Sequence, residues 1–308
     1  MTAFSLKVVA IVSMLIDHIG AVFSTYTPIT LRWVGRIAFP IFAFMIAQGC
    51  KHTKNIYKYL ARLGVLAIIS EVFFDLAFNS RMTIKGVFEP GIHFLVRTNV
   101  FYTLFLGVAC IVIYEGLKTK TRPGWSYLPF LCIPMAFMLS FVPYLSTILM
   151  MAYTAGALCL SHFLPNKAEI EPTAVKHKII PFLTALPVLL TADALSTDFG
   201  ALGVGLIFFL YLGNPDNKVS RAVILTAGMI WLYGRNLFAG VGSFVDGQLG
   251  GWAINYNRLG ILLFALLAVI LVSFYNGKQG RKVKWAFYVF YPAHLALLTA
   301  MWYFFVGV

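Results

Sequence analysis

The chain has 308 residues, of which 60% are hydrophobic, 16% are aromatic and only 11% are charged. A soluble globular domain carries about 25% charged residues, so this composition excludes a soluble globule and predicts an integral membrane protein. The formal net charge of +13 does not indicate nucleic-acid binding. The basic residues lie in short segments between hydrophobic runs, which is where membrane topology places them.

The hydrophobic runs follow one another along the whole length, so we expect a single membrane domain over residues 1–308. A membrane-spanning helix needs about 20 mostly apolar residues. The segments that fit this pattern are 6–25, 32–50, 60–79, 99–116, 126–142, 145–164, 179–196, 200–213, 221–238, 253–273 and 285–306. The sequence therefore predicts an all-α, polytopic transmembrane helical bundle. The short segment 200–213 and the proline-containing pair at 126–164 leave its number of spans open between ten and eleven.

Most of the 24 lysine and arginine residues fall in alternate loops. These loops are the segments around residues 51–62, 118–122, 167–178, 218–221 and 278–284, together with Lys7. Because cytoplasmic loops carry an excess of basic residues, we expect a cytoplasmic N-terminus in a multi-pass protein of the plasma membrane. The glycine-rich stretch 239–251 then lies in an external loop, either as a flexible connector or as a lid over a substrate.

Ionisable residues stand inside the first two predicted spans. Such a group costs several kcal/mol unless it is paired or faces a wet cavity. Asp17 and Arg36 reach similar depths on consecutive antiparallel helices, so we predict an ion pair between them. His18 points about 100° away from Asp17 and is predicted to face an internal chamber. Arg32 shares a helix face with Arg36 and either binds substrate or reaches the external interface.

Glu71 and Asp75 lie four positions apart in the third predicted span, on one helix face. Two carboxylates in this arrangement repel each other unless a cation lies between them or one is protonated. The candidates for that cation are Arg36, Arg235 or Arg258. Both a structural ion-pair network and a catalytic pair fit the pattern, so both interpretations stay open, and we include the two carboxylates among candidate substrate-binding residues.

The later spans contain three further candidates for substrate binding. Asp193 is expected at membrane depth, whereas Asp198 stands just before an apolar run and is expected to cap the next helix. Tyr291 and His294 lie three positions apart and share a face of the last span. Pro292 between them removes an amide hydrogen and bends the helix. We therefore expect a substrate contact at Asp193, Tyr291 and His294.

The run Met14-Leu15-Ile16-Asp17-His18, followed by Gly35-Arg36-Ile37-Ala38-Phe39-Pro40, resembles the TraX family. That family is named after the membrane protein that N-acetylates conjugative pilin. The similarity extends through residues 59–63, 192–205 and 285–295 and covers essentially the whole chain. TraX-like proteins are similar to a larger group of membrane acyltransferases, including acyltransferase family 3 and the lysosomal heparan-glucosaminide N-acetyltransferase.

The resemblance implies an acetyltransferase that takes the acetyl group from cytosolic acetyl-CoA. It implies an amine or hydroxyl acceptor, on a peptide N-terminus or a glycan, presented in or beyond the lipid bilayer. His18 corresponds to the first-helix histidine that is the catalytic centre of the larger group, and we expect it to act as general base beside Asp17 and Arg36. The candidate residues for the phosphates of acetyl-CoA are Lys51, Lys54, Lys58, Arg62 and Lys284.

A transporter is the alternative function. In a proton- or anion-coupled transporter, the same buried charges would form a relay across the membrane. Many transporters are built from repeated halves, and the absence of a convincing internal repeat favours the enzyme. No pair of histidine or cysteine residues has the spacing of a zinc site, so we expect no metal.

Overall fold

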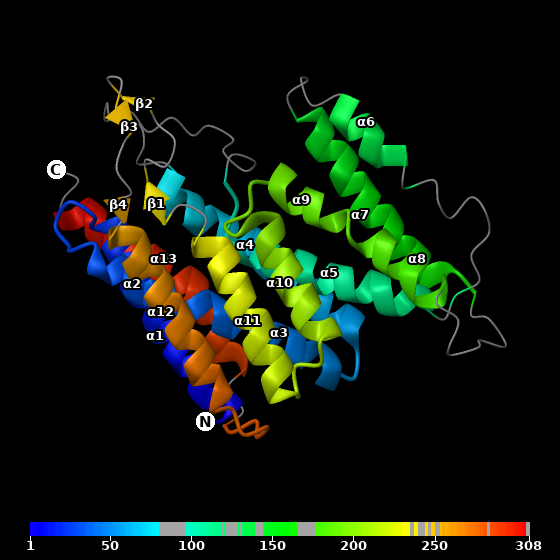
Figure 1. Cartoon of the computed structure of the whole chain (residues 1–308), viewed down its shortest axis with the longest axis horizontal. Coiled ribbons are helices and arrows are strands. Elements are labelled where there is room, and N and C mark those ends of the chain that lie inside the picture. The colour runs from blue at the N-terminus through cyan, green and yellow to red at the C-terminus, as the bar shows by residue number, and fades with distance from the viewer. Residues whose placement is uncertain are drawn as a thin grey trace. The chain divides into compact units, whose positions relative to one another are not determined.

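The structure is a computed structural model and describes residues 1–79, 97–118, 120, 129, 131–138, 144–165, 176–234, 237–239, 244–245, 248–249, 253–254, 256–281 and 284–305 (Figure 1). Its helices are α1 (Ala3–Val22), α2 (Thr30–Gly35), α3 (Ala38–His52), α4 (Ile56–Phe74), the π-helix η1 (Asp75–Asn79), α5 (Val100–Lys118), α6 (Cys132–Met138), α7 (Leu145–Phe163), α8 (Lys176–Ala185), α9 (Val188–Ala194), α10 (Gly200–Leu212), α11 (Lys218–Tyr233), α12 (Tyr256–Ser273) and α13 (Lys284–Phe305). Two antiparallel ladders pair β1 (Phe238–Ala239) with β4 (Ala253–Ile254) and β2 (Phe244–Val245) with β3 (Gln248–Leu249).

Five helical segments in the described part of the chain are long and apolar enough to cross a membrane. They are Ala3–Val22, Thr30–His52, Val100–Lys118, Leu145–Phe163 and Tyr256–Ser273, and Ile179–Ala194 and Gly200–Leu212 are shorter apolar helices. The protein is therefore an all-α, multi-pass membrane protein, which confirms the predicted fold class. The remaining predicted spans coincide with α4, α6, α11 and α13, although much of 126–142 lies outside the described residues. The number of spans and the cytoplasmic N-terminus stay predictions.

Two of the predicted spans are each broken into two helices. The expected continuous helix over 32–50 is interrupted at Arg36 and Ile37, between α2 and α3. Pro40 is the cause, because it has no amide hydrogen to donate to the carbonyl four residues earlier. Pro187 separates α8 from α9 in the same way. Thr30–His52 is nevertheless long and apolar enough to cross a membrane, as the predicted span over 32–50 requires, and Arg36 lies at the end of α2.

The chain divides into two compact units. Unit 1 contains Met1–Gln48, Val72–Pro90 and Leu212–Val308, and unit 2 contains Gly49–Glu71 and Gly91–Tyr211. The helices α3, α4 and α10 each begin in one unit and end in the other. The prediction of a single domain over residues 1–308 is not tested by this division, and each unit is described by itself.

The short helix α2 packs against both α1 and α12 in unit 1 (Figure 1). Glycines permit these close contacts. A Cβ atom on Gly35 would lie 2.2 Å from the Cβ atom of Asp17, and one on Gly260 would lie 2.5 Å from the ring of Trp33. The indole nitrogen of Trp33 also donates a hydrogen bond of 2.6 Å to Asn257 at the start of α12. The close backbone contacts at these glycines and the hydrogen bond from Trp33 to Asn257 thus hold α2 between α1 and α12.

The segment before α13 is bonded to the start of α1. The amides of Ala3 and Phe4 donate to the carbonyls of Lys278 and Gln279 at 2.9 and 3.1 Å. These amides belong to the first helical turn, which has no partners within the helix itself. Gly280 follows with φ of +72°, a backbone conformation that side chains other than glycine rarely adopt. This contact fixes how far α1 and α13 are shifted along one another.

Arg221 joins α3, α11 and α12 within unit 1, although the sequence indicated only a topological role for it. Its side chain is 3% exposed, and its guanidinium group lies 5.4 Å from the ring of Phe44 and 5.7 Å from that of Tyr275. Nη2 donates to the carbonyls of Ser273 and Tyr275. A cation is favourable there because the carbonyls at a helix C-terminus carry partial negative charge. Burial raises the pKa of the Tyr275 phenol, so its hydroxyl stays protonated.

In unit 2, α5 packs against α7, α8 and α9. Buried polar contacts cross this interior. The Tyr153 hydroxyl donates to the carbonyl of Thr184 at 2.6 Å, and the hydroxyls of Thr154 and Thr191 lie 2.8 Å apart. The hydroxyls of Tyr153, Thr154 and Thr191 therefore each have a partner, as is usual for buried polar groups.

The close approach of α1 and α2 predicts that Gly35→Ala destabilises the protein. The added methyl group overlaps the carboxylate of Asp17, and overpacking of this kind costs about 1–3 kcal/mol. The measurement is the thermal unfolding midpoint in detergent. Gly205→Ala in α10 is the matched control, because its Cβ would meet its nearest neighbour at an ordinary 3.4 Å. Equal midpoints for the two variants would contradict the proposed contact.

Candidate active site

Asp17 and His18 are neighbours in α1 and face different helices. Successive residues of an α-helix point about 100° apart. Asp17 contacts the arginines on and beside α2, whereas His18 contacts α13 and η1. The sequence predicted a pairing role for Asp17, which the ion pairs confirm, and an internal chamber in front of His18, which stays a prediction.

Asp17 binds two arginines at once. Its Oδ1 lies 2.7 Å from Arg36 Nη2, and its Oδ2 lies 2.8 Å from Arg32 Nη1. Arg32 Nη1 also donates to the main-chain carbonyl of Asp17 at 3.0 Å, and Arg36 Nε donates to the carbonyl of Arg32 at 3.0 Å. The predicted ion pair between Asp17 and Arg36 is present. The structure adds Arg32 to it, so the group bears two positive charges and one negative charge.

His18 forms a hydrogen bond with His294 of α13. His18 Nδ1 and His294 Nε2 lie 2.7 Å apart, and the two side chains are 9% and 5% exposed. The rings are nearly parallel, with 6° between their planes. The other ring nitrogen of His294, Nδ1, lies 2.8 Å from the carbonyl oxygen of Phe290, one helical turn earlier. A continuous hydrogen-bonded chain therefore runs from His18 through His294 to the backbone of α13.

Aromatic rings surround the histidine pair. The rings of Phe78 and Tyr291 lie 5.3 and 5.9 Å from that of His18, and Phe290 stacks on His294 at 4.7 Å. Phe78 belongs to η1, and π-helical turns occur frequently at functional sites. A hydrogen bond in apolar surroundings is electrostatically stronger than one in water. The structure therefore supplies a buried imidazole whose orientation is fixed by its neighbours.

Comparison with known proteins identifies the family. Residues 3–164, more than half of the chain, match the TraX protein family. The chain belongs to the TraX family. It is also 28% identical over 311 aligned residues to a probable fimbrial assembly protein FimC, serogroup H1, of Dichelobacter nodosus, and the match covers 97% of the chain and 95% of that protein. No solved structure matches the chain.

The segment that matches the TraX family contains His18 and its neighbours Asp17, Arg32 and Arg36. His294 lies outside that segment, on α13. The histidine pair therefore joins the TraX segment to the last helix of the chain. We regard this pair and the Asp17 group as the candidate active site.

Glu71 is fully buried in unit 2 and binds Asn99. Its Oε2 accepts from the Asn99 main-chain amide at 3.0 Å and from Asn99 Nδ2 at 2.5 Å. Asn99 Nδ2 also donates to the carbonyl of Ala67, and its Oδ1 accepts from the amide of Phe101. Glu71 thus ties α4 to the start of α5. Of the arginines predicted beside it, Arg36 binds Asp17, and Arg235 lies outside the described residues.

The remaining predicted carboxylates lie at helix ends. Asp75 is the first residue of η1, next to α4. Asp193 Oδ1 accepts from the amide of Ala201 at 2.7 Å, in the first turn of α10. Asp198, which was expected to cap this helix, pairs with Arg97 at 2.9 Å. The sequence indicated that an aspartate binds the start of α10. The aspartate that accepts from a first-turn amide of α10 is Asp193.

Four of the predicted phosphate-binding residues lie around the turn from α3 to α4 in unit 2. Lys51 has its ammonium group 5.7 Å from the centre of the Tyr211 ring. Lys54, Lys58 and Arg62 are exposed, and Arg62 Nε donates to the carbonyl of Lys58 at 3.2 Å. The side chain of Lys284 lies outside the described residues, as does most of the glycine-rich stretch 239–251.

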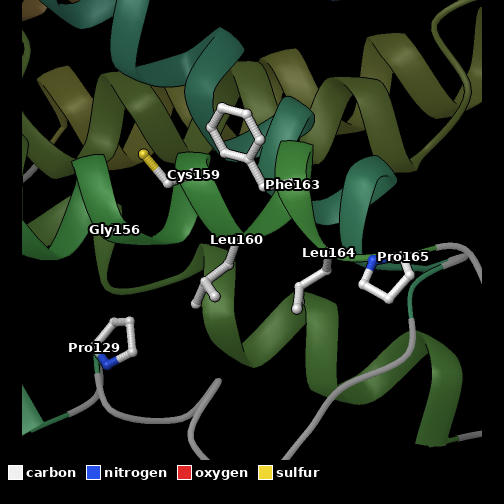
Figure 2. A pocket seen from close by; sticks show the side chains of 7 residues that line it. All are labelled: Pro129, Gly156, Cys159, Leu160, Phe163, Leu164 and Pro165. Atoms are coloured by element: carbon white, nitrogen blue, oxygen red, sulfur yellow. The ribbon is translucent and has the colours of Figure 1, made fainter.

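Unit 2 also contains a cavity of about 470 Å³ along α7. Figure 2 shows Cys159, Leu160 and Phe163 on α7, with Pro129 beyond them. Apart from the thiol of Cys159, the side chains that line this cavity are apolar. The described side chains that line this cavity include none of the candidate site residues, so we do not place the active site here.

The sequence did not indicate Phe78 or Phe290 as site residues. Phe290 lies four residues before His294, and that spacing would have been sufficient to find its carbonyl as a partner. The spacing of Phe78 in the sequence did not indicate a contact with the site. Phe78 lies in a π-helical turn, where the side chains that share a face differ from those of an α-helix.

Asp17→Asn is predicted to destabilise the protein, because Arg32 and Arg36 then lose their counter-charge. Removing one partner of a buried ion pair costs about 3–5 kcal/mol, and partial exposure of these arginines places the expected loss at the lower end of that range. The matched control is Asp198→Asn, whose partner Arg97 is 55% exposed and whose loss costs about 0–1 kcal/mol. Thermal unfolding in detergent compares them, and a control as damaging as Asp17→Asn would contradict this assignment.

Proposed function

We propose that this TraX-family protein is a membrane acetyltransferase that uses acetyl-CoA as its donor and His18 as its general base. The observation that carries the proposal is the buried hydrogen bond between His18 and His294. Imidazole accepts and releases protons near neutral pH, and this imidazole is held in one orientation. The similarity to a fimbrial assembly protein supports an acceptor amine on a protein subunit that is assembled into a fimbria or pilus.

In the proposed reaction, the acceptor nitrogen attacks the carbonyl carbon of the acetyl thioester. A carbon–nitrogen bond forms as the carbon–sulfur bond breaks. His18 removes the proton that the nitrogen loses and then passes it to the departing thiolate, so the products are the acetylated acceptor and free CoA thiol. A general base of this kind contributes about 10²- to 10⁴-fold to the rate.

Asp17, Arg32 and Arg36 support this reaction mainly by positioning. They hold α2 against α1, on a helix face about 100° away from His18. The geometry therefore favours a positioning role for Asp17 and Arg36 over the direct catalytic role that the sequence suggested. We propose Tyr291 as a residue that contacts substrate, because its ring lies beside that of His18.

The donor is proposed to bind through its phosphates to basic residues. Arginine and lysine form charge-assisted hydrogen bonds with phosphate, and Lys51, Lys54, Lys58 and Arg62 are exposed around one turn. The ring of Tyr211 beneath Lys51 gives this turn an aromatic surface as well.

A proton-coupled transporter is the second candidate. A hydrogen-bonded histidine pair among apolar side chains is also suited to passing protons between two compartments. The two functions differ in their products, since only the enzyme releases free CoA thiol.

His18→Gln is predicted to reduce acetyl transfer by at least about 100-fold without unfolding the protein. The assay uses proteoliposomes supplied with acetyl-CoA and a synthetic peptide with a free N-terminal amine, and it measures free thiol and acetylated peptide. The control is His162→Gln, which changes an exposed histidine of unit 2 and should leave the rate unchanged. Wild-type activity in His18→Gln would contradict the proposal, and proton flux without release of free thiol would favour the transporter.

A further inference from the structure

We infer that His294 is a positioning residue that fixes the tautomer of His18, so that Nε2 of His18 is the atom that removes the acceptor proton. The sequence suggested a different role for His294, in contact with substrate. This inference rests on the proposed function for its chemistry, but the tautomer assignment is drawn from the hydrogen bonds and the burial of the two histidines.

The backbone carbonyl of Phe290 begins the deduction. A carbonyl oxygen can only accept a hydrogen bond, so Nδ1 of His294 must carry the hydrogen that it shares with Phe290. A neutral imidazole has one N–H group. Nε2 of His294 is therefore an acceptor, and Nδ1 of His18 must donate to it across the 2.7 Å contact. The lone pair of His18 then resides on Nε2.

The deduction requires His294 to be neutral, and its surroundings favour that state. Its side chain is 5% exposed and lies among the rings of Phe290, Tyr291 and His18. A buried charge in such surroundings carries a large desolvation cost unless it is paired. Both ring nitrogens of His294 are engaged, with His18 and with Phe290, which argues against a substrate contact through either of them.

The hydrogen bond between His18 and His294 orients the base and also stabilises it once it has taken up a proton. When Nε2 of His18 takes up a proton, the ring becomes a cation that still donates through Nδ1 to His294. A charge-assisted hydrogen bond is roughly twice as strong as a neutral one. The bond between the two histidines therefore strengthens as the proton is transferred, and an interaction that is stronger in the transition state raises kcat.

Two substitutions at one position test this role. In His294→Gln, the amide oxygen can still accept from His18 Nδ1, whereas the side chain in His294→Leu cannot. We expect kcat to fall about 10- to 100-fold in His294→Leu, the range found for residues that orient a metal-bound imidazole, with KM for acetyl-CoA unchanged. His294→Gln should recover most of that loss. A common loss in both variants, or wild-type kcat in His294→Leu, would overturn the inference.

A second measurement does not depend on enzymatic activity. Solid-state ¹⁵N NMR of histidine-labelled protein in lipid bilayers distinguishes a ring protonated at Nδ1 from one protonated at Nε2, and comparison with His18→Gln assigns the His18 signals. We expect His18 to be protonated at Nδ1 in the wild type and in His294→Gln, but not uniformly in His294→Leu. Protonation at Nε2 in the wild type would overturn the inference. If acetyl transfer is absent while Nδ1 is protonated, the proposed function fails and the tautomer assignment holds.

Discussion

The cost of a charge in apolar surroundings governs this structure. Asp17 lies in a helix that is apolar enough to cross a membrane, and two arginines neutralise it there. Gly35 allows the backbone of α2 to come close enough for these contacts. The charge group therefore joins α1 to α2 and fixes the rotation of α1 about its own axis. Once that rotation is fixed, His18 must face a different helix.

The last helix meets His18 because of a second constraint, along the helix axis. The carbonyls of Lys278 and Gln279 bind the first-turn amides of α1. This contact sets the shift between α1 and α13, so that His18 and His294 lie at the same level. Rotation from the ion pairs and register from the backbone contacts together place two imidazole rings within hydrogen-bonding distance, although 276 positions separate them in the chain.

The sequence predicted the interaction between helices that follow one another in the chain, and it missed the interactions between segments that are far apart in the chain. The pairing of Asp17 with Arg36 followed from their depths on consecutive antiparallel helices. The pairing of His18 with His294 did not, because no local rule states which distant helices lie side by side. Asp198 was expected to cap α10, but it pairs with Arg97, a partner far away in the chain. The roles of the site residues in catalysis stay predictions in every case.

The identity of the residue beside His18 follows from the same electrostatic constraint. A carboxylate would orient an imidazole equally well, but a carboxylate among Phe78, Phe290 and Tyr291 would need its own counter-charge. A neutral histidine, whose Nδ1–H donates a hydrogen bond to the Phe290 carbonyl, needs none. The one carboxylate on this stretch of α1, that of Asp17, lies on the face where two arginines bind it. A neutral pair on one face and a carboxylate paired with two arginines on the other let a single helix carry both residues through apolar surroundings.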